Sequence, residues 1–579
     1  MPQGYKGDKV DVQWWVGQVA KGKKFRKEYA HEDRWKDWRN WGRGNWKGGI
    51  LPNNVYFKMI RTLVPRTYFR NPSVSITQTQ PGMEEMLLAK LLERVDNKLL
   101  DVMKFKEQMK RAVLHGAMFG TGGIRRGYGA EFSPTPDALG TEKPDVGGRR
   151  LREFTEYNDL VSANRPWSLC AHPGTIIIPE GAIDIHDARW VCYEYQRPKA
   201  DILEDPRMKN KDGINESVRN TASGGTLLPW GEKLRSDGTI LWEIRDKKTR
   251  TVFVLAPFAD NTTHDVQKPL YFEDDELSRN GRLNFYPLIF NQDDEVFWGI
   301  SDSIIIEPQQ LEANQIRTQM MYHRRIMLTK FLYEKGAITP DELSKLLSDQ
   351  NIGAGVQTNN INAVKLMEAI PMPAGLVEAD GLVSQNVQEL LGLGVNQFGE
   401  YAPGSADRSA TEANIVNQAT SIRIDERRDT CADLLVDFTT DMNDDIVEYW
   451  SSDMVVDLVG PAGVPIWVQF HPRLLRTGQY NVKIDPDSSI PLTKQYREQK
   501  ALQTYGAFFG KNPDINPHEL TRFVLNEMYG VDADSIMNNP MMNTTQQNPM
   551  PVSQVAQQLQ NMPKPSNSNI PQLPSQALQ

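Results

Sequence analysis

The residues best suited to metal or nucleophilic chemistry lie between positions 170 and 192. They are four soft ligands and one carboxylate: Cys170, His172, His186, Asp187 and Cys192. A zinc site would require several of these side chains to converge. Residues 175–179 between them read as a strand, and the spacings match no standard zinc finger. We therefore interpret the set as turn residues and core thiols, and we expect no metal and no cofactor.

Motifs for nucleotide binding and for acyl hydrolysis do not occur in the sequence. The run Gly120-Thr-Gly-Gly123 follows a helical pattern and precedes a strand, which reverses the order of a phosphate-binding loop. No Walker A loop and no Gly-x-Ser-x-Gly elbow is present. Acidic runs such as Asp293-Asp294-Glu295 are typical of solvated faces. We expect no catalytic residue and no ATP-driven motor activity in this chain.

Length and composition are ordinary for a soluble protein with several structural regions. The chain has 579 residues, 39% of them hydrophobic and 24% charged, and its size favours two to four structural regions. No apolar run approaches the ~18 residues of a membrane helix, and the N-terminus lacks the apolar core of a secretory signal. Three scattered cysteines favour a reducing compartment. We expect no contact with a membrane.

The net charge of −8 bears on any interaction with nucleic acid. Tight binding to duplex DNA comes mainly from Lys and Arg side chains that neutralise phosphates. A mostly acidic wall would instead repel a polyanion evenly. The charge balance therefore argues against a static DNA-binding domain, and it is compatible with a channel through which duplex slides.

The predicted secondary-structure elements are clearest between Trp298 and Trp450. Apolar periodicity predicts a helix over 301–330, a compact insert over 331–372 and a second helix over 374–393. A loop rich in Gly and Pro follows at 394–407, and a very long helix then runs from Ser409 to Trp450. This order is rare in enzymes and suits a ring with a tunnel.

In this order of elements the chain resembles the portal (head–tail connector) proteins of tailed double-stranded DNA phages. The likeness extends over 46–70, including Leu51-Pro-Asn-Asn54, and to Arg70-Asn-Pro72. It implies an α+β phage portal fold with a mixed wing, a two-helix stem flanking a small clip, a tunnel loop, a long wing helix and a helical crown. The implied regions are an N-terminal wing region 1–297, a first stem helix 298–330, a clip 331–373, a second stem helix 374–395, a tunnel loop 396–409, a long wing helix 410–451, strands returning to the wing 452–490, crown helices 491–537 and a flexible tail 538–579.

Patterns outside the stem predict the rest of this architecture. A helical pattern spans 83–119, and β-rich runs occur at 175–179, 190–195, 241–244, 251–255 and 288–290. After the long helix, strands are predicted at 465–470 and 480–484, and helices at 493–509 and 517–529. From Asn538 onward the chain is almost uncharged and rich in Gln, Asn, Pro and Ser, which favours a flexible tail.

The first stem helix supplies the candidate DNA-channel residues. They are Arg317, His323, Arg324, Arg325 and Lys330. In a bore, such cations would touch passing phosphates transiently. The amides between them, Gln309, Gln310, Asn314, Gln315 and Gln319, could exchange weak hydrogen bonds with the moving backbone. The alternative is that the cations form ion pairs with acids on a neighbouring subunit.

Two further sets of residues follow from the resemblance. The tunnel loop would present Asn396, Phe398, Tyr401 and Arg408 at the narrowest point of the channel, and the alternative is an ordinary loop between helices. The clip would dock a packaging terminase first and tail adaptor proteins afterwards, through a polar and exchangeable surface. Its candidate docking residues are Glu334, Lys335, Asp341, Glu342 and Lys345.

Two charged or aromatic segments allow both a structural and a functional interpretation. Trp35, Trp38 and Trp41 recur on one helical face, which favours burial, while the basic run 21–27 leaves nucleic-acid contact open. The charged middle of the long helix, 423–429, is interpreted as a solvated waist, with a bend or a subunit crossing as the alternative.

The resemblance implies a homo-oligomeric ring, a dodecamer, at one vertex of a bacteriophage capsid. The ring would form a channel for viral genome packaging into the head, for retention of the DNA and for its ejection. Implied partners are double-stranded DNA without sequence specificity, terminase, tail adaptor proteins and the major capsid protein. The protein would be assembled in the host cytoplasm and reside in the virion. The alternatives are a virion structural protein without a channel, such as a baseplate or scaffold component, and a nucleic-acid-processing enzyme built on the Cys/His set.

Overall fold

The computed structural model describes residues 3–6, 9–46, 50–69, 71–78, 83–133, 141–142, 152–153, 159–211, 214, 238–256, 268–278, 281–326, 330–334, 339–341, 344, 364–367, 372–390, 410–450 and 480–484. The chain divides into two compact units, 1–490 and 491–579, and all described residues belong to the first. The strand predicted at 465–470, both helices predicted beyond 490 and the predicted tail lie outside the described residues. Within the described part, no helix combines the length and apolar character needed to cross a membrane.

The N-terminal helices bury their aromatic residues. After the short strands β1 (Tyr5–Lys6) and β2 (Lys9–Val10) come α1 (Val12–Tyr29), a 3-10 turn (Glu32–Arg34), α2 (Trp35–Gly42) and α3 (Val55–Thr67). Trp35, Trp38 and Trp41 are all buried, as their helical spacing predicts.

Two cations of the basic run in α1 bind groups within the chain. Arg26 is buried, and its guanidinium donates to the carbonyl oxygens of Gly174 and Ile176 at 2.8 and 2.9 Å. Lys23 forms an ion pair with the buried Glu194 and lies over the Trp242 ring. These two cations are committed to the protein's own groups, so the nucleic-acid alternative does not apply to them, whereas Lys21 and Lys24 of the same run are exposed.

The helical pattern over 83–119 proves to be two helices. α4 (Met83–Val102) and α5 (Phe105–Phe119) are separated at Lys104, whose φ of +52° lies in the left-handed region. Such a residue cannot continue a right-handed helix, and the apolar spacing alone does not reveal the break. Strand β4 (Thr121–Ser133) begins directly after Gly120.

The glycine run after α5 allows a helix and a strand to pack closely. A Cβ atom at Gly122 would lie 2.1 Å from the carbonyl oxygen of Ala112, and Gly120 has a φ of +86°. Glycine is therefore required at 122 because of the close contact, and it is favoured at 120 because of the left-handed backbone angle. The central strand β4 pairs antiparallel with β7 (Asp159–Cys170) and β13 (Phe285–Ile289).

A five-stranded antiparallel sheet holds the second large group of strands, in the order β12-β11-β10-β9-β8. Its strands are β8 (Ile176–Ile177), β9 (Trp190–Pro198), β10 (Gly238–Asp246), β11 (Thr251–Leu255) and β12 (Tyr271–Asp274). The β-rich runs predicted at 190–195, 241–244 and 251–255 are confirmed as strands. Trp15 of α1 packs edge-on against Phe253, with ring centroids 5.1 Å apart, so α1 closes this core.

The remaining strands form two-stranded ladders. β3 (Val74–Gln78) pairs antiparallel with β16 (Tyr480–Ile484), the strand predicted at 480–484. β5 (Thr141–Glu142) pairs with β6 (Arg152–Glu153), and β14 (Lys330–Tyr333) pairs with β15 (Val364–Met367). A short helix, α6 (Lys199–Glu204), follows β9.

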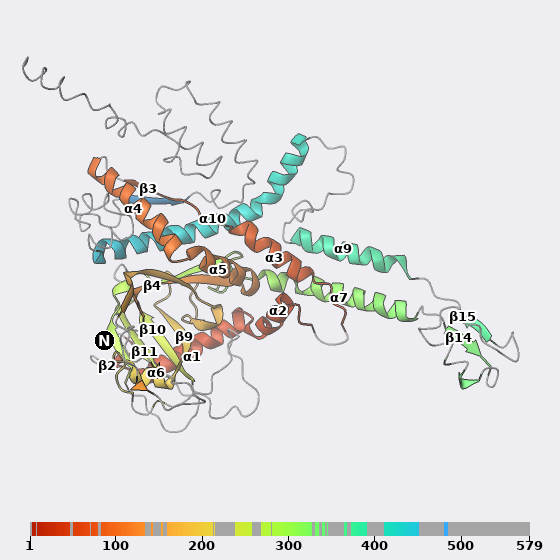
Figure 1. The fold of residues 1–579 in the computed structure, drawn as a ribbon, viewed down its shortest axis with the longest axis horizontal. Coiled ribbons are helices and arrows are strands. Elements are labelled where there is room, and N and C mark those ends of the chain that lie inside the picture. Colours follow the sequence, from red (N-terminus) through yellow and green to blue (C-terminus); the bar gives the residue numbers. More distant parts are fainter. Residues whose placement is uncertain are drawn as a thin grey trace, which may run out of the picture. The chain divides into compact units, whose positions relative to one another are not determined.

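Three helices complete the described part of the first unit. They are α7 (Asp302–Ile326), α9 (Ala374–Leu390) and the 40-residue α10 (Ala410–Tyr449) (Figure 1). The prediction that the first of them reaches Lys330 is wrong at its end, because Lys330 opens strand β14. The C-terminal half of α10 packs in one core with α4 and α5, through residues such as Leu435, Phe438 and Met442.

Candidate functional site

Helices α7 and α9 lie side by side and run antiparallel (Figure 1). Arg317, late in α7, forms an ion pair with Asp380, early in α9, at 3.9 Å. Gln309, early in α7, lines a cavity of about 440 Å³ together with Asn386 and Leu390, late in α9. Val383 and Val387 of α9 are buried in a core that includes Ile316 and Met320 of α7. The chain thus forms a unit of two antiparallel helices. The segment that connects them in the sequence contains the β14–β15 pair.

The amides of α7 hold the segment before α3. Asn314 accepts a hydrogen bond from the Asn53 backbone at 2.9 Å, and Gln310 accepts one from the Tyr56 backbone at 2.7 Å. Gln310 also donates to the Asn53 carbonyl oxygen at 2.6 Å, and the Asn53 side chain donates to Asp380 of α9 at 3.0 Å. Gln310 and Asn314 are buried, so their predicted exposure to passing DNA is wrong.

The charged middle of α10 is anchored on α7 and α9. Arg427 donates two hydrogen bonds to the carboxylate of Asp302, each 2.8 Å long, and both side chains are buried. Arg423 donates to the carbonyl oxygen of Leu390, the last residue of α9, at 2.7 Å. Arg428 donates to the carbonyl oxygen of Arg66. The predicted solvated waist is therefore wrong, since residues 427 and 428 join α10 to other elements.

The candidate DNA-channel residues differ in their exposure to solvent and in their ion pairing. Arg317 is half exposed and is paired within its own chain, whereas the alternative placed its partner on a neighbouring subunit. Arg324 and Arg325 are exposed and form no ion pair with any described residue. His323 is partly buried, and its Nδ1 atom has no hydrogen-bond partner among the described residues. The side chain of Lys330 lies outside the described part.

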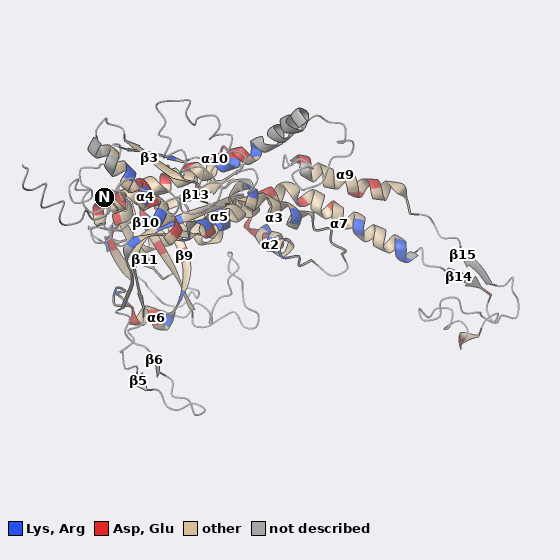
Figure 2. Cartoon of the chain, turned by 45° about the horizontal axis from the view of Figure 1, so that its top comes forward, with Lys and Arg blue, Asp and Glu red and all other residues tan. Residues whose placement is uncertain are grey.

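Figure 2 shows the resulting distribution of charge. Basic residues occupy the C-terminal half of α7, and acidic residues are spread along α9. The candidate docking residues Glu334 and Asp341 are exposed. The other docking candidates, Lys335, Glu342 and Lys345, and the whole tunnel-loop set, Asn396, Phe398, Tyr401 and Arg408, lie outside the described residues.

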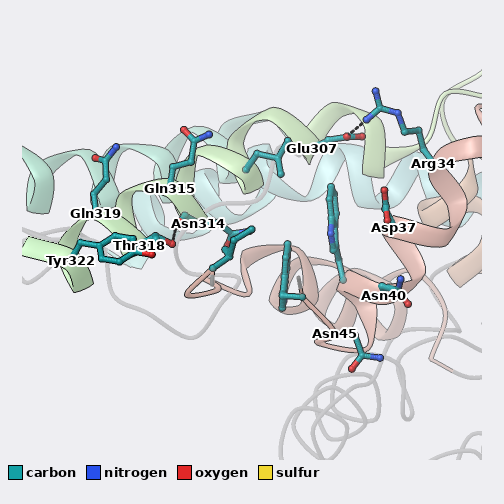
Figure 3. A pocket seen from close by; sticks show the side chains of 14 residues that line it. Arg34, Asp37, Asn40, Asn45, Glu307, Asn314, Gln315, Thr318, Gln319 and Tyr322 are labelled. Atoms are coloured by element: carbon teal, nitrogen blue, oxygen red, sulfur yellow. Dashed lines mark hydrogen bonds and ion pairs between the residues drawn. The ribbon is translucent and has the colours of Figure 1, made fainter. Parts of the chain in front are cut away.

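A groove between α2 and α7 was not anticipated from the sequence (Figure 3). Its volume is about 660 Å³, and its apolar lining consists of Trp41, Trp46, Ile50 and Leu311, with Tyr322 at one end. Its rim carries Arg34 and Glu307, which form an ion pair, and the amides Gln315 and Gln319. Trp41 and Trp46 stack with ring centroids 5.4 Å apart. The groove brings together residues about 270 positions apart, for which local spacing gives no signal.

The Cys/His set of residues 170–192 does not converge on one point. Cys170 and His172 lie near each other, and His115, which sequence patterns did not single out, completes their surroundings. The Cys170 Sγ atom is 3.4 Å from His115 Nδ1, and the His115 and His172 rings are 4.9 Å apart. Cys192 instead belongs to the Trp15 core, and His186 lines a separate cavity beside Asp437. No group of three potential ligands among the described residues could hold a metal ion.

The electrostatics of this cluster favour neutral groups. Burial lowers the pKa of His115 to about 4 and raises the pKa of the Cys170 thiol to about 12. Burial and the neighbouring His115 hold the pKa of His172 well below its usual value. Because a reactive cysteine requires a thiolate, this arrangement suits packing and not nucleophilic catalysis.

Comparisons with known proteins place few constraints on the chain. No family model matches the sequence, and no curated protein matches it. Among solved structures, the chain is similar to one described as "Neck of native GTA particle computed with C12 symmetry". The two are 9% identical, the match covers 85% of this chain and 93% of that chain, and the TM-score is 0.35. A superposition at this level does not establish a shared fold.

Proposed function

We propose that this protein is the portal protein of a tailed phage, a ring-shaped channel for double-stranded DNA with no catalytic activity of its own. The observation that carries the proposal is the antiparallel pair α7–α9. It brackets the β14–β15 pair in sequence and is followed by α10, which bonds to both helices. This order supports the proposal because it is the stem, clip and long-helix order that the resemblance to portal proteins implies.

The charges on α7 suit transient contact with DNA. Arg324 and Arg325 are exposed, and no described acid neutralises them. Repeated around a ring, two such cations per copy would touch phosphates without reading sequence. The net charge of −8 per chain keeps the remaining surface repulsive to the polyanion. A duplex would therefore be guided at few points and could slide.

The contacts of α10 suit a conduit that senses its contents. Arg427 fixes α10 to the start of α7, and Arg423 fixes it to the end of α9. A displacement of α10 would therefore act on both helices of the pair. In this proposal the insert 331–373 docks terminase during packaging and tail adaptor proteins afterwards, and the ring contacts the major capsid protein.

Electron microscopy of the purified full-length protein tests the proposal directly. We expect rings of about twelve copies, as the resemblance implies, with a central hole at least ~20 Å wide, because B-form DNA must pass. Views down the ring axis measure both quantities. A stable assembly without a central hole would overturn the proposal and favour the virion structural protein without a channel. A monomer would be re-examined at higher concentration, since ring closure depends on protein concentration.

A further inference from the structure

The α2–α7 groove leaves apolar surface uncovered on a folded chain. Leu311 is 42% exposed, Ile50 is 41% exposed and Tyr322 is 48% exposed. They share one concave surface with the stacked Trp41 and Trp46. Contiguous apolar surface rimmed by polar groups is typical of a binding site for another macromolecule.

The outer face of α9 is a second uncovered surface. Val377 and Leu382 are each 59% exposed, although the helix buries Val383 and Val387. A Cβ atom at Gly375 or Gly381 would meet nothing within 4 Å. No described element of the chain covers this face, and its small residues leave room for close approach of another helix.

The two surfaces point away from each other. On a helix with about 3.6 residues per turn, the α7 residues that face α9 (Ala313, Ile316, Arg317 and Met320) lie opposite those that line the groove (Glu307, Leu311, Gln315, Thr318 and Tyr322). On α9, the exposed Gly381 and Gln385 lie likewise opposite Val383 and Val387. One chain therefore cannot bring its own α9 outer face into its own groove, but two copies can.

The charges of the two surfaces are complementary. On α9 the acids Glu378 and Glu389 are exposed, Asp380 is already paired with Arg317 of α7, and the helix has neither Lys nor Arg. The groove side of α7 ends at Arg325, seven residues after Thr318 and therefore on the same face. Arg325 is exposed and has no ion-pair partner among the described residues. An acidic helix laid along the groove would supply one.

We propose that the α2–α7 groove of one copy binds the outer face of α9 of a second copy, with Leu382 and Val377 on Leu311 and the Trp41–Trp46 stack, and an α9 carboxylate near Arg325. The inference rests on the proposed ring, whose subunit contact it assigns. Such a contact joins two different surfaces and is heterologous, so it repeats from copy to copy and closes when the rotation allows. An isologous contact would stop at a dimer.

Charge substitutions on the two surfaces test the contact. Leu382→Asp and Leu311→Asp each place a carboxylate in the interface while changing a side chain that is exposed in the single chain. Each is expected to raise the concentration for half-assembly at least ~tenfold, measured by mass photometry and light scattering. Leu203→Asp, on α6 and 46% exposed, is the matched control and should assemble like the wild type.

Mixing the two variants gives a sharper result. L311D retains an intact α9 face, and L382D retains an intact groove. At concentrations too low for either variant to associate alone, equal amounts should therefore form two-subunit species through one intact contact, without rings. The double variant L311C/L382C should form disulfide-linked ladders between chains under mild oxidation, whereas either single cysteine variant should not.

The outcomes separate this inference from the proposed function. Wild-type rings that persist in both charge variants would overturn the groove contact and leave the portal proposal standing. A wild-type assembly without a hole that both variants disrupt would keep the contact and overturn the portal proposal. Absence of self-association and of cross-linked ladders in every sample would overturn both.

Discussion

The five-stranded sheet and helix α9 belong to the same compact unit but satisfy their apolar residues in different ways. All five residues of β11 are buried, and Phe253 lies against Trp15. Among the described side chains of α9, only Val383 and Val387 are buried, whereas Val377 and Leu382 are largely exposed. The sheet buries its apolar residues within one chain, whereas α9 buries one face and leaves apolar residues of the other face exposed.

This difference indicates where the chain is self-sufficient and where it depends on assembly. Burial of apolar area contributes ~25 cal/mol per Å², so the sheet contributes to stability in a single copy. The exposed face of α9 contributes only when another surface covers it. Substitutions in the sheet should therefore change unfolding, and those on α9 should change association.

The largest expected effect comes from the sheet core. Phe253→Ala should lower the free energy of unfolding by ~3–5 kcal/mol, because a fully buried ring is replaced by a cavity. Its cross-strand partner Phe272 is 41% exposed, so Phe272→Ala is the matched control and should cost less than ~1 kcal/mol. Urea unfolding followed by tryptophan fluorescence measures both. Equal losses would show that the sheet does not hold the core assigned to it.

The next effect concerns the junction of α10 with α7. Arg427→Gln should cost ~3 kcal/mol, because it leaves the Asp302 carboxylate buried without its cation. Adding Asp302→Asn should recover much of that loss, since the remaining groups are both neutral. A double-mutant cycle by urea unfolding measures the coupling. Strict additivity of the two single changes would contradict a direct ion pair.

Asp96, a buried acid between α4 and α10, should differ from Asp302, because the folded protein favours its protonated form and not its carboxylate. Asp96 accepts a hydrogen bond from the Asn443 side chain at 3.1 Å, and the other carboxylate oxygen and the Asn443 oxygen have no partner among the described residues. Burial raises the pKa of Asp96 well above its usual value, so the folded protein favours the protonated acid. That stabilisation is fully present below about pH 4 and is lost as the pH rises through the folded-state pKa.

Asp96→Asn supplies the neutral group without a proton. The D96N variant should be more stable than the wild type at pH 7, and this difference in unfolding free energy should shrink toward pH 4. Thermal or urea unfolding between pH 4 and pH 7 measures it. A matched Asp302→Asn variant should instead be less stable than the wild type at pH 7, because Arg427 loses its counter-ion. A D96N protein that is less stable at neutral pH would contradict a protonated Asp96.

The smallest effect on unfolding should come from the outer face of α9. Leu382→Ser should change the free energy of unfolding of the isolated chain by less than ~0.5 kcal/mol, because the side chain is 59% exposed. The buried neighbour Val383 serves as the control, and Val383→Ala should cost at least ~1 kcal/mol. Unfolding of dilute protein separates the two. A large loss for L382S would mean that its own chain covers the residue.

Periodic and β-rich segments could be predicted because their signal is local. The tryptophan stripe of α2, the strands at 190–195, 241–244 and 251–255, and the long helix from 410 follow from spacing and residue type. The break at Lys104 was missed, because a left-handed residue that interrupts a helix leaves the apolar period on both sides intact.

For the candidate site, the order of its helices along the chain could be predicted, but the contacts of their side chains could not. The positions of α7, α9 and α10 along the chain follow from the sequence. Which of their polar side chains are buried does not, since Gln310 and Gln315 are both amides on the same helix, one buried and the other exposed. Arg317, Arg324 and Arg427 likewise have the same charge, and only their surroundings decide whether each is paired.

By itself, the sequence determined the element order, the periodic faces of the helices and the absence of nucleotide-binding motifs, because each of these depends on residues close together in the chain. Only the tertiary structure decided that Arg427 meets Asp302, that β16 pairs with β3 and that α2 and α7 share a groove. Those contacts join residues more than a hundred positions apart. Their free energy arises from burial and desolvation at the contact, and local spacing does not specify either.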